Sequence, residues 1–337
     1  MKNIFGILLC LVISLPAWYA GRAFPLFGAP VIAILAGIVI SLVAPNLVKL
    51  KFGRNFSFGE GVKFTSKKLL QYSIVLLGFG MNLFNILNVG RTSLFVLLLV
   101  FLAAFVAAFF TGRILKLTGN TTVLIGVGTS ICGGSAIAAV APVIRAEEED
   151  VTRAISTIFL FNVIAVFIFP ALGRLMGMDD IIFGMWAGTA INDTSSVVAA
   201  GTAWSYAAGN NTALSYATIV KLTRTLMIVP VTLTLAFYTA KKLKDGEKGN
   251  FKFTKVFPWF VLFFIAAAIV KTFLGLPAET SSLLVQTGKF VITMAMVAIG
   301  LNTNLPNLFA SGIRPLVLGC ICWSAIALTA LAALRFI

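Results

Sequence analysis

The feature that most constrains the fold is a series of apolar runs, most of them about as long as a lipid bilayer is thick. A hydrocarbon core of about 30 Å is crossed by about 20 helical residues. Hydrophobic residues make up 59% of the chain and only 11% are charged, far less than in soluble domains. We therefore predict an all-α polytopic membrane protein, with spans at residues 4–20, 28–45, 67–83, 93–112, 151–173, 213–240, 257–275, 286–303 and 315–335.

Two further apolar segments, 121–146 and 181–207, are interrupted near their centres by glycine and small polar residues. Counting them gives about 9 to 11 transmembrane helices, two of which are discontinuous or re-entrant. Each segment could cross the membrane or could enter and leave on one side as a hairpin. Both topologies leave the basic loops on the same side, so charge does not decide between them.

The charged residues of the chain predict its orientation. The chain has 26 Lys and Arg against 11 Asp and Glu, and the basic residues lie in short loops between apolar runs. This pattern orients membrane spans and gives no indication of nucleic-acid binding. We predict that the Lys-rich loops 46–66 and 241–256 are cytoplasmic, together with the amino terminus. A cleaved signal peptide over residues 4–20 is the alternative to a first span.

Two internal similarities indicate a duplicated architecture. Residues 78–82 align with 298–302, and residues 128–140 align with 188–200 without gaps. Small-residue membrane helices can also resemble one another by chance, which is the alternative. If both interrupted segments are hairpins, the first opens to the cytoplasm and the second to the outside, as in inverted-topology repeats. We predict one membrane domain, 1–337, with repeat-like halves 28–173 and 181–335.

The two interruptions are the first candidates for a binding site. Unwound backbone at membrane depth is tolerated where protein or a water-filled cavity satisfies its polar groups. A helix that restarts after a break presents free amides and roughly half a positive charge, which favours an anion. A packing notch for a neighbouring helix is the alternative. The predicted substrate-binding residues are Cys132, Gly133, Gly134, Ser135, Asn192, Asp193, Thr194 and Ser195.

Two basic residues inside an apolar run extend this candidate site. Lys221 and Arg224 are three residues apart and therefore share one helical face. A charge at the centre of a span costs about 3 kcal/mol, so each needs a partner, and Asp193 is the nearest candidate. The alternative is that both side chains extend to water from a span end. Two cations and one carboxylate leave a net positive site that suits a small anion.

Asn82 and Asn302 complete the predicted site because they occupy equivalent repeat positions. They could bond the interrupted elements or cap their own spans. The chain has no His, its four Cys lie in apolar segments, and neither a GxSxG nor a P-loop motif occurs. We therefore expect no enzyme activity, no metal and no cofactor. An anion channel and a membrane-embedded enzyme are the alternative functions.

Three motifs indicate a family: TSICGGSAIAAVAPVIRA at 129–146, WAGTAINDTSSVVAAG at 186–201 and IVKLTRTLMIVPV at 219–231. Over essentially its whole length the chain resembles the bacterial inner-membrane proteins of YeiH type, which carry the label of sulfate exporters. That family is grouped with the cation:proton antiporter and anion transporter superfamily. The resemblance implies a secondary carrier in the inner membrane, and it is compatible with an elevator motion and a homodimer.

One position departs from that family pattern. His often precedes the aspartate of the second motif, whereas this chain has Asn192. A proton relay through His is therefore excluded. The coupling ion is then either a proton carried by Asp193 or Lys221, or a sodium ion bound around residues 192–196. We expect a secondary transporter for sulfate or a sulfur-containing organic anion. The resemblance implies export as the direction of transport.

Overall fold

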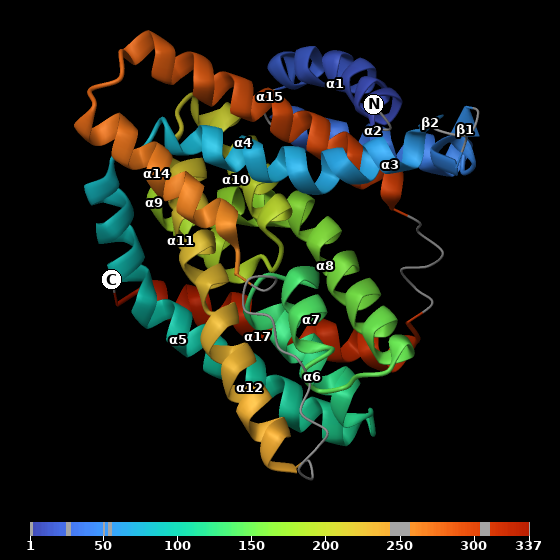
Figure 1. Cartoon of the computed structure of the whole chain (residues 1–337). Coiled ribbons are helices and arrows are strands. Elements are labelled where there is room, and N and C mark those ends of the chain that lie inside the picture. The colour runs from blue at the N-terminus through green and yellow to red at the C-terminus, as the bar shows by residue number, and fades with distance from the viewer. Residues whose placement is uncertain are drawn as a thin grey trace.

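The computed structural model describes residues 3–24, 28–49, 51–52, 56–242, 257–303 and 311–336 (Figure 1). These residues form helices except for loops and two short antiparallel strands, β1 (Lys51–Phe52) and β2 (Phe56–Ser57). Helices bond their backbone polar groups internally, which is the condition for a chain to lie in hydrocarbon. The prediction of an all-helical protein is therefore confirmed.

Six helical stretches in the described part of the chain are long and apolar enough to cross a membrane. Each expected span overlaps at least one helix, but the number of crossings and the inverted repeat stay predictions. The six stretches are α1 (Ile4–Ala23), α5 (Leu83–Ile114), α8 (Glu148–Leu175), α11 (Thr212–Leu226) with the first part of α12 (Ile228–Lys242), α15 (Ala278–Asn302) and α17 (Ile313–Leu334). The shorter apolar helices are α2 (Gly28–Val43) and α14 (Trp259–Phe273).

One group of helices forms the upper layer in Figure 1: α1, α2, α14, α15 and the continuous run of α3 (Phe58–Phe64), η2 (Thr65–Leu69) and α4 (Leu70–Gly78). Glycine allows close approach of the helices in this layer. A Cβ atom added to Gly37 of α2 would lie 2.9 Å from the Cα atom of Gly300 in α15. Small residues of this kind let membrane helices pack backbone to backbone.

The second group contains the two interrupted segments and lies mostly below the first in Figure 1, with α9 and α10 drawn behind α4 and α14. Its long helices are α5, α8, α11 with α12, and α17. The interrupted segments are α6 (Gly119–Ser130) with α7 (Gly134–Val140), and α9 (Asp180–Ala190) with α10 (Thr194–Ala208). Helix α10 also packs against α2, since a Cβ atom on Gly28 would lie 2.8 Å from the Cα atom of Ala203.

The start of the chain lies beside the first Lys-rich loop. A Cβ atom on Gly6 would lie 2.6 Å from the Cα atom of Gly61, so α1 and α3 begin at the same end of the molecule. This agrees with the prediction that the amino terminus and loop 46–66 share one side. Residues 50 and 53–55 of that loop, and residues 243–256 of the second Lys-rich loop, lie outside the described residues.

Candidate functional site: two helical hairpins that meet at their tips

The first interrupted segment is a hairpin. Helix α6 ends at Ser130, residues 131–133 reverse the chain, and α7 begins at Gly134. Gly133 makes the reversal with φ 69° and ψ −131°, a region that side chains other than glycine rarely adopt. A Cβ atom on Gly128 would lie 2.9 Å from Cδ1 of Ile137, so α7 folds back along α6.

The second interrupted segment is also a hairpin, and hydrogen bonds join the start of α9 to the end of α10 and the residues that follow it. Asp180, at the start of α9, accepts from Trp204 Nε1 and from Asn210 Nδ2, each at 2.7 Å. The rings of Phe183 and Trp204 stack with centroids 4.0 Å apart. The start of α9 therefore lies beside the end of α10, and the turn at residues 191–193 is the far end of the hairpin.

Helix α8 shows that the two hairpins open in opposite directions. At its start, Asp150 accepts hydrogen bonds from Thr118 at 2.7 Å and from Thr121, both at the open end of the first hairpin. Near its end, a Cβ atom on Gly173 would lie 2.6 Å from the Phe183 ring of the second hairpin. The sequence left hairpin and crossing topologies open, and these contacts favour hairpins.

The two tips, residues 131–133 and 191–193, meet at the middle of α8. The Asn162 side chain accepts a hydrogen bond from the backbone N–H of Asp193 at 3.0 Å. A Cβ atom on Gly133 would lie 3.4 Å from Nδ2 of Asn162 and 3.5 Å from Cβ of Asp193. Asn162 therefore touches both tips. Asn162 was not among the predicted site residues, although it is the single amide in the apolar run 158–168 and therefore a signal in the sequence.

Lys221 and Arg224 of α11 bind the carboxyl ends of α6 and α9, which are the first arms of the two hairpins. Lys221 Nζ donates to the carbonyl oxygens of Ile131 at 2.8 Å, Ile191 at 3.1 Å and Asn192. Both side chains are buried, with 0% and 1% of their surface exposed. The carbonyl end of a helix carries roughly half a negative charge, which compensates a buried cation.

The guanidinium group of Arg224 makes a similar set of contacts one turn further along α11. It donates to the carbonyl oxygens of Ser130 at 2.7 Å and Ile191 at 3.2 Å, and to those of Thr129 and Thr189. These bonds use all three donors of the ammonium group and four of the five of the guanidinium group. The printed sequence suggested Asp193 as the partner, whereas the hydrogen bonds of both cations go to backbone carbonyls.

Asp193 instead caps the second arm of its own hairpin. Its carboxylate accepts from the backbone N–H of Ser195 at 2.9 Å and from the Ser195 hydroxyl. Asp193 thus occupies the N-cap of α10, a position that carboxylates favour because the first amides of a helix lack partners. The negative side chain and the positive end of α10 are paired at the second tip.

Other predicted site residues lie at the tips with different exposure. Asn192 is completely buried, and neither polar atom of its side chain has a hydrogen-bond partner among the described residues. Cys132, Gly133, Thr194 and Ser195 are buried, Gly134 is half-buried and Ser135 is exposed. Buried polar groups are normally bonded, so the free Asn192 amide is a group that a ligand or a water molecule could satisfy.

Asn82 and Asn302 make their hydrogen bonds away from the tips. The Asn82 side chain accepts from the N–H of Phe84 at 2.8 Å and so caps α5, the helix that follows it. Asn302 donates to the Ser66 hydroxyl at 3.5 Å. Both side chains are exposed. The structure therefore does not join these two residues to the hairpin tips.

The chain belongs to the family described as conserved hypothetical protein 698, whose model matches residues 5–319. It is 49% identical over 336 residues to a UPF0324 membrane protein of Streptococcus pyogenes serotype M18, covering 98% of this chain and 96% of the relative. It is 45% identical over 345 residues to a UPF0324 membrane protein of Fusobacterium nucleatum, with 98% and 97% covered. No solved structure matches the chain.

These relatives are named as membrane proteins, and the apolar helices agree with that name. The names of these relatives state neither a substrate nor a transport activity. Sulfate export and membership of the antiporter superfamily, which the sequence motifs suggested, therefore remain predictions. Membership of the UPF0324 membrane protein family is the part of the resemblance that is confirmed.

Proposed function

We propose that this protein is a secondary transporter that carries a small anion across the bacterial inner membrane by alternating access. The observation that supports it is the meeting of two opposed hairpins at a pair of buried cations, Lys221 and Arg224. Broken helices that meet at membrane depth form the substrate and ion sites of many secondary transporters. The inverted repeat, the cytoplasmic amino terminus and a homodimeric assembly belong to the same proposal.

The charge at the tips favours an anion as substrate. Lys221 and Arg224 contribute two positive charges and Asp193 one negative charge, which leaves one positive charge before a substrate binds. The cations stabilise the anion through their field, because their hydrogen-bond donors are largely occupied by carbonyl oxygens. Direct contacts come from the Asn192 amide and the Thr194 hydroxyl at the start of α10. Sulfate or a sulfur-containing organic anion is the proposed substrate class.

Asp193 is the proposed site of ion coupling. Its carboxylate caps α10 and lies within the contact region of Gly133 and Asn162, so its protonation or ion binding would act on both tips. A proton would be carried by the carboxylate itself. A sodium ion would use the same carboxylate together with nearby hydroxyl and carbonyl oxygens, which are the ligands that hard cations prefer.

The experiment is exchange transport in proteoliposomes that contain the purified protein. Vesicles loaded with sulfate, thiosulfate or taurine are placed in the same labelled anion, with an imposed pH gradient or an imposed sodium gradient. The proposal expects saturable exchange with one of these anions, accelerated by one of the two gradients. Conductance that does not saturate would instead identify a channel, and product formation without a gradient would identify a membrane-embedded enzyme.

A matched pair of variants tests whether transport depends on the hairpin tips. Asn192→Ala removes the unpartnered amide and is expected to lower transport at least about tenfold, since losing a bond to a charged group costs about 1.5 to 3 kcal/mol. Asn88→Ala, on the exposed surface of α5, is the control and keeps normal exchange. Equal exchange by both variants would remove Asn192 from the proposed site.

A further inference from the structure

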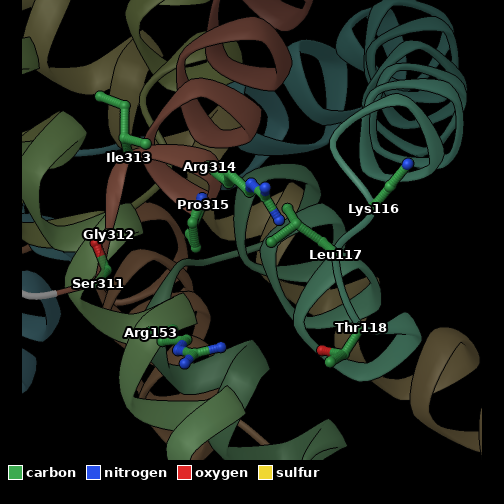
Figure 2. Close-up of a pocket in the computed structure, with 9 residues that line it drawn as sticks. All are labelled: Lys116, Leu117, Thr118, Arg153, Ser311, Gly312, Ile313, Arg314 and Pro315. Atoms are coloured by element: carbon green, nitrogen blue, oxygen red, sulfur yellow. The ribbon is translucent and has the colours of Figure 1, made fainter.

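A second candidate binding site lies away from the hairpin tips, where three separate segments surround a cavity of about 360 Å³ (Figure 2). The segments are the turn between α5 and α6, the first turns of α8, and the start of α17. Each contributes one basic side chain: Lys116, Arg153 and Arg314. A cavity of this size is within the range that holds small ligands.

The polar lining of the cavity is cationic. Among the described residues the lining contains no carboxylate, and the side chains of Lys116 and Arg314 make no hydrogen bond and no ion pair there. Glu149 outside the lining pairs with Arg153, and Asp150 accepts a hydrogen bond from the Thr118 hydroxyl. Two of the three cations therefore have no counter-charge within the described part of the chain.

The backbone conformation at Lys116 allows a substitution that removes its charge without destabilising the fold. Lys116 has φ 51° and ends α5 in a turn in which the N–H of Leu117 bonds to the carbonyl oxygen of Gly112 at 3.0 Å. Glycine is the usual residue at this position, because a side chain in the left-handed region is strained. Lys116→Gly therefore removes the basic side chain and relieves strain at the same time.

The cavity also has an apolar side, part of which is exposed. Leu117, Ile313 and Pro315 form part of its lining. Ile313 is 74% exposed, and Ile114 at the end of α5 is 78% exposed. Exposed isoleucines at the ends of two apolar helices are expected at a membrane boundary, where basic pockets bind the head groups of anionic lipids.

We propose that this cavity binds a phosphate group, carried by an anionic lipid or free in solution. The two guanidinium groups provide donors that match the oxygens of a tetrahedral oxyanion, while the ammonium group of Lys116, which points away from them in Figure 2, adds positive charge. The start of α17 adds to the positive field, because Gly312 provides no side chain to cap its first amides. The site is independent of the proposed transport site.

The test measures the unfolding temperature of the purified full-length protein with three probes: short-chain phosphatidylglycerol, inorganic phosphate and a neutral short-chain diacylglycerol. A ligand that binds the folded state raises the unfolding temperature by an amount that grows with the logarithm of its concentration divided by its Kd. A rise with phosphatidylglycerol alone identifies a lipid head group, and a rise with phosphate as well identifies the phosphate group itself. A rise of equal size with the diacylglycerol, or no rise with any probe, would overturn the proposal.

Three variants locate the binding. Lys116→Gly relieves the left-handed strain, so it is expected to raise the unfolding temperature without ligand. It should also lower the affinity for phosphatidylglycerol about tenfold. Arg145→Gly is the matched control, because Arg145 has nearly the same φ, 52°, and the same charge but is not in the lining. Arg314→Ala should also weaken binding. Affinities in Lys116→Gly and Arg314→Ala equal to that of Arg145→Gly would contradict the assignment.

Discussion

The two hairpins share a plan but differ at their tips. Their first arms have 12 and 11 residues, and in both a reversal of three residues precedes the second arm. The first tip reverses through Gly133, which has a positive φ and no side chain. The second reverses in extended backbone and begins its second arm with the carboxylate of Asp193. The first tip is thus built from backbone, while the second carries titratable and amide side chains.

This difference separates structural from chemical roles. Lys221 and Arg224 bond to carbonyl oxygens of both first arms, so they hold the two hairpins in the same way. Asp193 and Asn192 occur at the second tip alone, because the corresponding positions of the aligned first segment are Gly133 and Cys132. Substitutions of the shared cations should therefore destabilise both hairpins. Substitutions at one tip should change only the role of that tip.

The largest effect is expected from Arg224→Met. The change leaves the carbonyl oxygens of Thr129, Ser130 and Thr189 without their buried donor. Breaking a buried ionic arrangement from one side costs about 3 to 5 kcal/mol, so we expect a loss of that size in the free energy of unfolding in detergent. Arg91→Met, at an exposed position of α5, is the control and should change it by less than about 0.5 kcal/mol.

Amide hydrogen exchange of the same Arg224→Met protein tests whether the cation is shared. Exchange measures local opening, and the comparison predicts faster exchange in both α6 and α9, whose carboxyl ends Arg224 binds. Faster exchange in one hairpin alone would show that Arg224 holds that hairpin and leaves the other to Lys221. A protein as stable as the Arg91→Met control would show that the carbonyl oxygens find water or other donors.

Much of this arrangement was visible in the sequence. The apolar runs predicted where the long helices lie, and α8 extends the expected span 151–173 by only a few residues. The interruptions at Gly133 and Asn192 to Asp193 were also predicted, because glycine and an N-cap residue are direct signals of a helix break. Both breaks are confirmed, since α7 begins at Gly134 and α10 at Thr194.

The partners of the buried cations were not predictable, because backbone carbonyls occur at every position and leave no mark in a sequence. Residue types alone favoured Asp193 as the partner of Lys221. The hairpin topology depends on contacts such as Asp180 with Trp204, which join residues far apart in the segment. Asn82 and Asn302 were grouped with the site by repeat position, a criterion that carries no information on distance.

A smaller effect is expected from Gly133→Ala, which tests the first tip. The new side chain would meet only ordinary contacts, with Asn162 Nδ2 at 3.4 Å, so the cost comes from the φ of 69°. Residues held in such conformations cost about 1 to 3 kcal/mol, which unfolding in detergent would measure. Gly134→Ala is the control: its Cβ meets nothing within 4 Å, and the change should leave stability equal or slightly higher. Equal costs at both glycines would contradict a reversal that depends on Gly133.

The smallest effect on stability is expected from Asp193→Asn, which tests the chemistry of the second tip. Asparagine caps a helix about as well as aspartate, so the free energy of unfolding should change by only a few tenths of a kcal/mol. Asp179→Asn is the matched control, because Asp179 caps α9 at the open end of the same hairpin through the N–H of Ile182 at 2.8 Å. In proteoliposomes, Asp193→Asn should lose acceleration by the coupling gradient while Asp179→Asn keeps it. If both variants respond to the gradient as the unmodified protein does, the carboxylate at the second tip is a cap alone, and the two tips differ in construction without differing in chemistry.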